Sequence, residues 1–298
     1  PVLISTRSHG KVNTFYPIRS KFNHAICRAE VDEKEYLLSA IDPMRPYNLL
    51  DFEDLNGSGL VVEEGKNPHW VILNKKASTT ATQLQLEISP DGFLTGNVDF
   101  SQNGYDALIA RHAIKEKGEE YLIEKLMKEI YKSNGILDYS FSKDIPENKV
   151  KGNLEIESDA FVTMAGDRIY LNPMLGFGLK SSPFKEESRE FPIDYGYGDR
   201  RIFSLVLDIP DGYEVEEMPE STRVALPERF GSFTYTSRQL GRKISINCMT
   251  SINEAVLPPE LYPYLKVFYG RIVEKQGEQI VLRKESKEDA EKASSKGE

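Results

Sequence analysis

The sequence contains few of the residues that several common classes of site require. Cys27 and Cys248 are the only cysteines among 298 residues, which excludes a disulfide-dense framework and a cysteine-rich zinc module. No apolar run approaches the roughly 20 residues of a membrane-spanning helix. The formal net charge of −9 is a field that repels nucleic acid. We therefore expect no cofactor, no metal, no nucleic-acid partner and no membrane span.

Alternation typical of β-strands is present over most of the chain. Two runs, 22–31 and 35–41, predict a hairpin around a charged turn. A turn at 90–92 joins the alternating runs 82–88 and 93–98, which is the clearest hairpin signal. Further β-runs are predicted at 154–161, 168–171, 203–209, 232–235, 243–252 and 280–282. The expected fold class is mainly β (α+β), with an antiparallel β-sandwich-like domain.

The hydrophobic period changes between residues 104 and 133. Leu122, Leu126 and Ile130 recur every four residues, so one helical face is apolar. Gly118 is expected to divide this stretch into two helices, and Gly135 to end it. A second helical stretch is predicted from 261 to 272, where apolar residues are four, three and four positions apart. We expect 104–133 to be the only long helical region.

Composition divides the chain into three parts. Residues 1–70 form a first unit, and a domain edge is expected between 65 and 77, after the proline- and glycine-rich stretch 43–59. Residues 77–284 form the β-sandwich-like domain with its helical insertion at about 104–133. Residues 285–298 are charged and lack apolar anchors, which predicts a flexible tail.

Several short motifs follow one another in an order that resembles bacterial transglutaminase-like proteins, in which a transglutaminase core lies between domains of unknown function. A stretch containing His24 leads through a charged turn into Tyr36-Leu37-Leu38, as a His strand leads into an Asp strand in that family. The resemblance runs from about Pro1 to about Lys284. The other motifs that carry it are Pro1 to Arg7, Leu55-Asn56-Gly57, Asp91 to Gly96, Gly104-Tyr105 and Asn172 to Leu175.

The resemblance implies a catalytic order of Cys, His and Asp along the chain. His24 matches the family's histidine, and Ser39, 15 residues later, occupies the position of its aspartate. The nucleophilic cysteine is expected upstream of Pro1, so the sequence is interpreted as the C-terminal part of a longer protein. A neutral serine cannot stabilise an imidazolium by charge. In a serine protease, replacing the aspartate that orients the histidine by a neutral residue lowers kcat roughly 10⁴-fold.

Two residues are candidates to replace the missing groups. Cys27 is three residues from His24, an odd separation that puts the two side chains on opposite faces of a strand. We therefore interpret Cys27 and Cys248 as unbonded packing residues. Asp42 could replace the family's aspartate only if the turn between the runs 22–31 and 35–41 has three residues. With the two-residue turn Asp32-Glu33, Ser39 shares the face of His24 and Asp42 points away.

The expected function is that of a non-catalytic structural or binding portion of a transglutaminase-like cell-envelope protein. The family implies export to the periplasm, although composition alone fits the cytoplasm equally well. The alternative is part of an active papain-like cysteine peptidase or transglutaminase, with its nucleophile upstream of Pro1 and His24 as base. Expected partners are the upstream segment of the same protein and a protein or peptide ligand.

Overall fold

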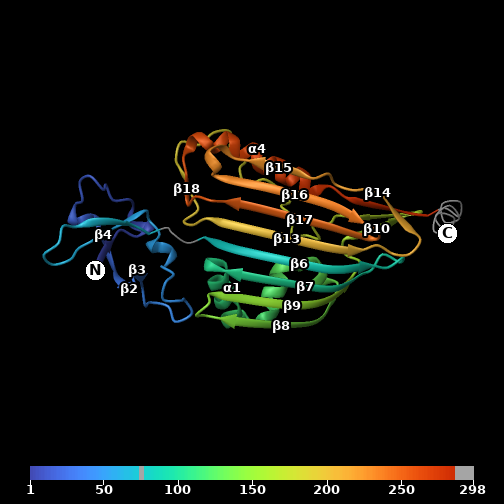
Figure 1. Ribbon diagram of the computed structural model, residues 1–298, viewed down its shortest axis with the longest axis horizontal. Helices are drawn as coiled ribbons and strands as arrows, with labels where there is room; N and C mark the ends of the chain where they lie inside the picture. The colour runs from blue at the N-terminus through green and yellow to red at the C-terminus, as the bar shows by residue number, and fades with distance from the viewer. Residues whose placement is uncertain (74–76, 286–298) are drawn as a thin grey trace.

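The computed structural model describes residues 1–73 and 77–285, which form a small N-terminal unit and a larger β-rich unit (Figure 1). The small unit is one antiparallel sheet in the order β3-β2-β1-β4-β5. Its strands are β1 (Val2–Ile4), β2 (His24–Val31), β3 (Lys34–Leu38), β4 (Ser58–Val61) and β5 (His69–Ile72).

The turn between β2 and β3 has two residues. Val31 pairs with Lys34, and both turn residues, Asp32 and Glu33, have positive φ angles of 51° and 61°. This combination defines a type I′ turn, whose backbone twist matches that of the strands it joins. The sequence left the turn length open, and the register settles it in favour of two residues.

The larger unit is built on one long sheet in the order β15-β16-β17-β13-β6-β7-β9-β8. Neighbouring strands are antiparallel except β6 and β13, which pair in parallel along ten residues. The strands are β6 (Ser78–Ile88), β7 (Leu94–Asn103), β8 (Ile136–Asp144), β9 (Lys149–Ser158), β13 (Asp199–Asp208), β15 (Thr222–Ala225), β16 (Gly231–Leu240) and β17 (Lys243–Ile252).

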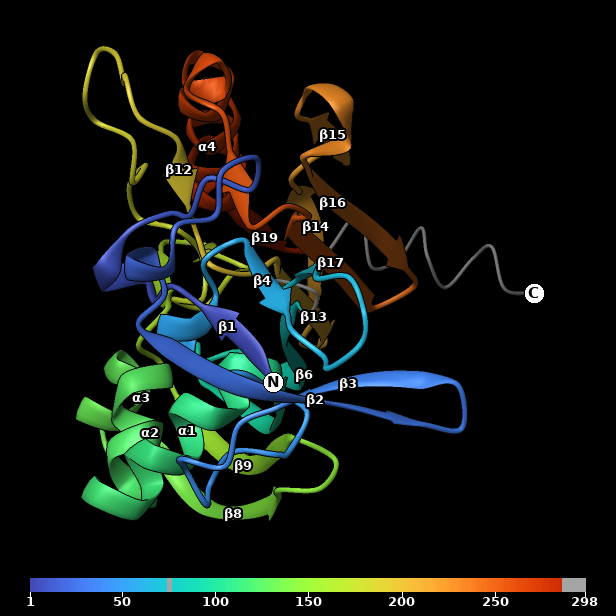
Figure 2. The same cartoon turned by 90° about the vertical axis from the view of Figure 1, so that its left-hand side faces the viewer.

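A second layer covers one face of this sheet. Helices α1 (Gly104–Lys117), α2 (Glu119–Leu126) and α3 (Lys128–Lys132) lie against the half that contains β9 and β8, whereas α4 (Tyr262–Gly277) lies near β15 at the other end (Figure 2). A small sheet, β10-β11-β19-β14, shares the same apolar core. Its strands are β10 (Val162–Ala165), β11 (Arg168–Leu171), β14 (Tyr213–Glu217) and β19 (Ile280–Lys284), and a separate pair is β12 (Ile193–Asp194) with β18 (Val256–Leu257).

The mainly β fold class is confirmed. The helical insertion divides at Gly118 as expected, but it forms three helices and not two, because Met127 has a non-helical backbone between α2 and α3. Gly118 has a φ of +88°. This angle is not helical, and glycine adopts it readily, so α1 ends there. Another expectation about helices is wrong: α4 has 16 residues and is longer than α1. Its buried Leu265, Phe268 and Ile272 give it an apolar face on the larger core, which stabilises a helix of this length.

The two units have separate apolar cores that meet at α1. Val2, Ile4 and Ile26 belong to the smaller core, and Tyr105 of α1 packs there rather than in the larger one. The Tyr105 hydroxyl also donates to the Leu50 carbonyl at 3.1 Å. Apart from residue 285, the expected tail lies outside the described residues. No helix of the described part is long and apolar enough to cross a bilayer.

Candidate functional site

His24 lies at the start of β2, where it pairs with Ile4 of β1. Its side chain is 32% exposed, and its Nε2 is 3.9 Å from Oδ1 of Asp54. This separation is longer than a hydrogen bond but within the range of an ion pair when the ring is protonated. The carboxylate beside His24 is thus supplied by a residue 30 positions along the chain.

Asp54 ends a short 3-10 helix, Phe52–Asp54, that follows the Asp51 cap. Its side chain is only 3% exposed, and Oδ2 has no hydrogen-bond partner among the described residues. Burial raises the pKa of this carboxyl, because the charged form loses its solvation, while His24 opposes the shift. A buried, poorly satisfied carboxylate next to a histidine is typical of a functional site.

The structure brings Ser39 to Arg45. Arg45 Nη2 donates to Ser39 Oγ at 3.1 Å, and Nη1 donates to Asp51 Oδ2 at 2.9 Å. The Arg45 side chain is 1% exposed. Strand β3 ends at Leu38, so Ser39 has already left the ladder that would carry it along the face of His24. The Ser39 hydroxyl is therefore engaged by this guanidinium.

Asp42, the alternative carboxylate, pairs with the larger unit. Its Oδ2 is 2.8 Å from Nε2 of His112 on α1, and its Oδ1 accepts from the Met44 N–H at 2.9 Å. Burial alone would raise the pKa of Asp42, but these hydrogen bonds outweigh it and lower the pKa. His112 of α1 therefore connects the two units.

The environments of the two cysteines differ from that of His24. Both are free, as expected. The expected burial of Cys27 is wrong: Ile26, on the face of β2 that His24 occupies, is buried, whereas Cys27 is exposed because the opposite face of the strand is uncovered. Cys248 is buried as predicted. Burial raises its pKa to about 11, although Gln276 donates to its Sγ at 3.3 Å.

The two aspartates predict opposite responses of stability to acid. The raised pKa of Asp54 means that protonation favours the folded state, so its contribution to stability rises as the pH falls through the folded-state pKa. The lowered pKa of Asp42 gives a contribution that is present above pH 3.8 and lost as the pH falls through its folded-state pKa.

We expect urea unfolding between about pH 7 and about pH 2.5 to separate the two. Relative to Asp54→Asn, the parent protein should gain stability on acidification. Relative to Asp42→Asn, it should lose stability. Equal pH profiles for the parent and both variants would show that neither carboxyl is perturbed.

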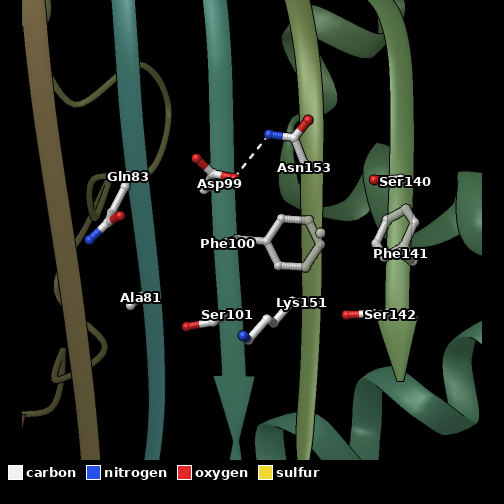
Figure 3. A pocket seen from close by; sticks show the side chains of 11 residues that line it. Ala81, Gln83, Asp99, Phe100, Ser101, Ser140, Phe141, Ser142, Lys151 and Asn153 are labelled. Atoms are coloured by element: carbon white, nitrogen blue, oxygen red, sulfur yellow. Dashed lines mark hydrogen bonds between the residues drawn. The ribbon is translucent and has the colours of Figure 1, made fainter. Parts of the chain in front are cut away.

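A shallow hollow of about 380 Å³ crosses the four strands β6, β7, β9 and β8 (Figure 3). Within it, Asn153 Nδ2 donates to Asp99 Oδ1 at 2.9 Å, and Lys151 adds an amine. Its other side chains include Gln83, Ser101, Ser140 and Ser142. These groups can hydrogen-bond a ligand, but the lining holds neither the imidazole base nor the thiol nucleophile that cysteine acyl transfer requires.

One family model matches part of this chain. Residues 167–282 match the model described as "Domain of Unknown Function with solved-structure structure (DUF3858)". This segment runs from β11 to β19 and covers less than half of the chain. No curated protein matches.

A solved structure, provisionally described as a protease from Parabacteroides distasonis, aligns with 95% of this chain at 11% identity and a TM-score of 0.46. The chain spans 39% of the length of that protein.

Sequence reasoning singled out His24 as a candidate residue, but neither Asp54 nor Arg45. Asp54 lies outside any alternating or helical run, so hydrophobic periodicity contains no signal for it. The one local hint is Asp51, a residue type that caps short helices and so marks the turn that carries Asp54. No group of three or more potential ligands in the described part of the chain could hold a metal ion.

Proposed function

We propose that this chain is the non-catalytic structural or binding portion of a transglutaminase-like cell-envelope protein. The observation that carries the proposal is the position of the two thiols relative to His24. Acyl transfer by a cysteine requires a thiolate within hydrogen-bond reach of the base. Cys27 is on the opposite face of β2, and Cys248 is buried in the larger core with a raised pKa.

The two cysteines would each have to overcome a different barrier to become nucleophiles. Cys27 cannot turn to the other face of β2 without breaking its pairing with Leu38 of β3. Cys248 is 3% exposed, and burial disfavours its thiolate. Neither barrier is removed by side-chain rotation alone. The placement in the cell envelope is supported by the family resemblance of the sequence.

We expect residues 1–298 to form no product from a fluorescent amine and a glutamine-containing protein, or from fluorogenic peptides. In the same samples Cys27 should react with iodoacetamide like an ordinary exposed thiol, and Cys248 only after denaturation. A product whose formation is lost in His24→Ala and Asp54→Asn, yet retained in the control His112→Ala, would contradict the proposal. That result would establish the second function described next.

A second candidate function is favoured by one observation, the buried carboxylate of Asp54 beside His24. In a cysteine acyltransferase or peptidase, an acidic group orients the histidine and stabilises its charged form. Under this alternative, His24 acts as base, Asp54 replaces the carboxylate absent at Ser39, and the thiol comes from another segment. The 3.9 Å separation would have to shorten in the assembled site, as catalytic hydrogen bonds often do.

A further inference from the structure

A second cavity lies on the covered face of the large sheet, beside α4. It has a volume of about 340 Å³, within the range of small-molecule sites. Strands β6, β13 and β17 form its floor. Its apolar walls come from the segment after β11 and from α4, namely Met174, Phe177, Leu179 and Tyr269. The cavity is therefore distinct from the His24 site.

Its polar groups form a row across three strands. Arg201 of β13 is in register with Thr80 of β6 on one side and with Thr250 of β17 on the other. Side chains in register on neighbouring strands lie on the same face, about 4.5 to 5.5 Å apart at Cβ. The strand pairing itself therefore places a guanidinium between two hydroxyl groups at the cavity.

Two carboxylates fix this row but leave part of the guanidinium open. Arg201 Nε donates to Asp199 Oδ2 at 2.9 Å, and this is its one hydrogen bond among the described residues. The Thr80 hydroxyl donates to Asp106 Oδ2 at 2.7 Å. The Arg201 side chain is 64% exposed, so both Nη nitrogens remain accessible. The Thr250 hydroxyl makes no side-chain hydrogen bond within the described part.

We propose that this cavity binds a small monocarboxylate with an apolar body. The carboxylate accepts from the two Nη groups of Arg201, in the forked geometry that arginine offers to planar anions, and from the Thr250 hydroxyl. The apolar body packs against Phe177 and Tyr269. Asp199 and Asp106 offset the charge of Arg201. Each further charge on a ligand therefore adds repulsion, so a ligand with one negative charge is favoured over phosphates and other polyanions.

This inference does not depend on whether the chain is catalytic. The cavity lies in the larger unit, and its residues include neither His24 nor Asp54. Loss of binding here would leave the proposed absence of catalysis untouched. Catalysis at His24 would equally leave this cavity unaffected.

The test is calorimetric titration of residues 1–298 with N-acetyl-L-phenylalanine, its neutral amide, and hexanoate. We expect the acid to bind and the amide to bind at least about tenfold more weakly, because the amide loses the charge-assisted hydrogen bonds. Hexanoate distinguishes two sources of the carboxylate, a free organic acid and a peptide C-terminus. Binding of both acids indicates a free organic acid, and binding of the acetylated residue alone indicates a peptide C-terminus.

Arg201→Gln should weaken binding of the acetylated acid about tenfold to a hundredfold. The matched control is Arg200→Gln, because Arg200 is the adjacent residue of β13, is exposed, and faces away from the cavity. Circular dichroism and the Tm establish that both variants fold. The inference is overturned if neither acid binds, if the amide binds as tightly as the acid, or if Arg200→Gln causes the same loss as Arg201→Gln.

Discussion

We expect Gly96→Ala to lower the free energy of unfolding by about 3 to 5 kcal/mol, since it combines backbone strain with overpacking. Gly96 lies within β7, between Leu86 of β6 and Ile156 of β9. Its φ is +143°, a value that residues with a side chain rarely adopt. An added Cβ would lie 2.1 Å from the backbone oxygen of Gln85, which cannot move without disturbing the ladder.

The control for this variant is Gly270→Ala. Gly270 is exposed within α4, and an added Cβ there meets nothing within 4 Å. Replacing a glycine inside a helix by alanine stabilises it by roughly 0.5 to 1 kcal/mol. Urea unfolding of the two variants should therefore give changes of opposite sign. A loss below about 1 kcal/mol for Gly96→Ala would mean that β7 relaxes around the new methyl group.

The second large effect is expected at the contact between the two units. Arg111 of α1 is fully buried. Its Nε donates to the Met44 carbonyl of the N-terminal unit at 2.9 Å, and its Nη2 donates to Asn148 Oδ1 at 2.8 Å. Arg111→Ala removes both bonds and opens a cavity, so we expect a loss of about 3 to 5 kcal/mol in urea unfolding.

His112→Ala is the matched control, because the next residue of α1 contacts the same loop through Asp42. The His112 side chain is 38% exposed, and partly exposed ion pairs contribute less than about 1 kcal/mol. If the two variants lost equal stability, Arg111 would not be the main connection between the units. A biphasic unfolding curve for Arg111→Ala alone would show directly that the units have been uncoupled.

Sequence reasoning succeeded where one local rule determined the structure. The paired turn residues and the alternation before Ile88 predicted hairpins, and Gly118 predicted a helix boundary. Strands such as β8 (Ile136–Asp144) and β14 (Tyr213–Glu217) were missed, because β8 is mostly exposed and β14 is short with a register shift. Neither presents the clean period of two on which such prediction depends.

The candidate site was predicted only in part for a related reason. His24 lies on a strand whose face can be worked out by counting residues, and the two-residue turn makes that count valid. The partner of a polar side chain depends instead on tertiary packing. Ser39 contacts Arg45, and His24 faces Asp54 from a turn elsewhere in the chain. No rule of local spacing links these pairs.

The parallel pairing of β6 with β13 sets a limit on how the larger unit can be divided. Residues 167–282, the segment that matches a family, include β13 but not its neighbour β6. Expressed alone, that segment would present the ten-residue edge of β13, from Asp199 to Asp208, without a partner strand. An unpaired edge of this length is a template for aggregation. A soluble expression product therefore needs to begin before Ser78, even where sequence similarity begins much later.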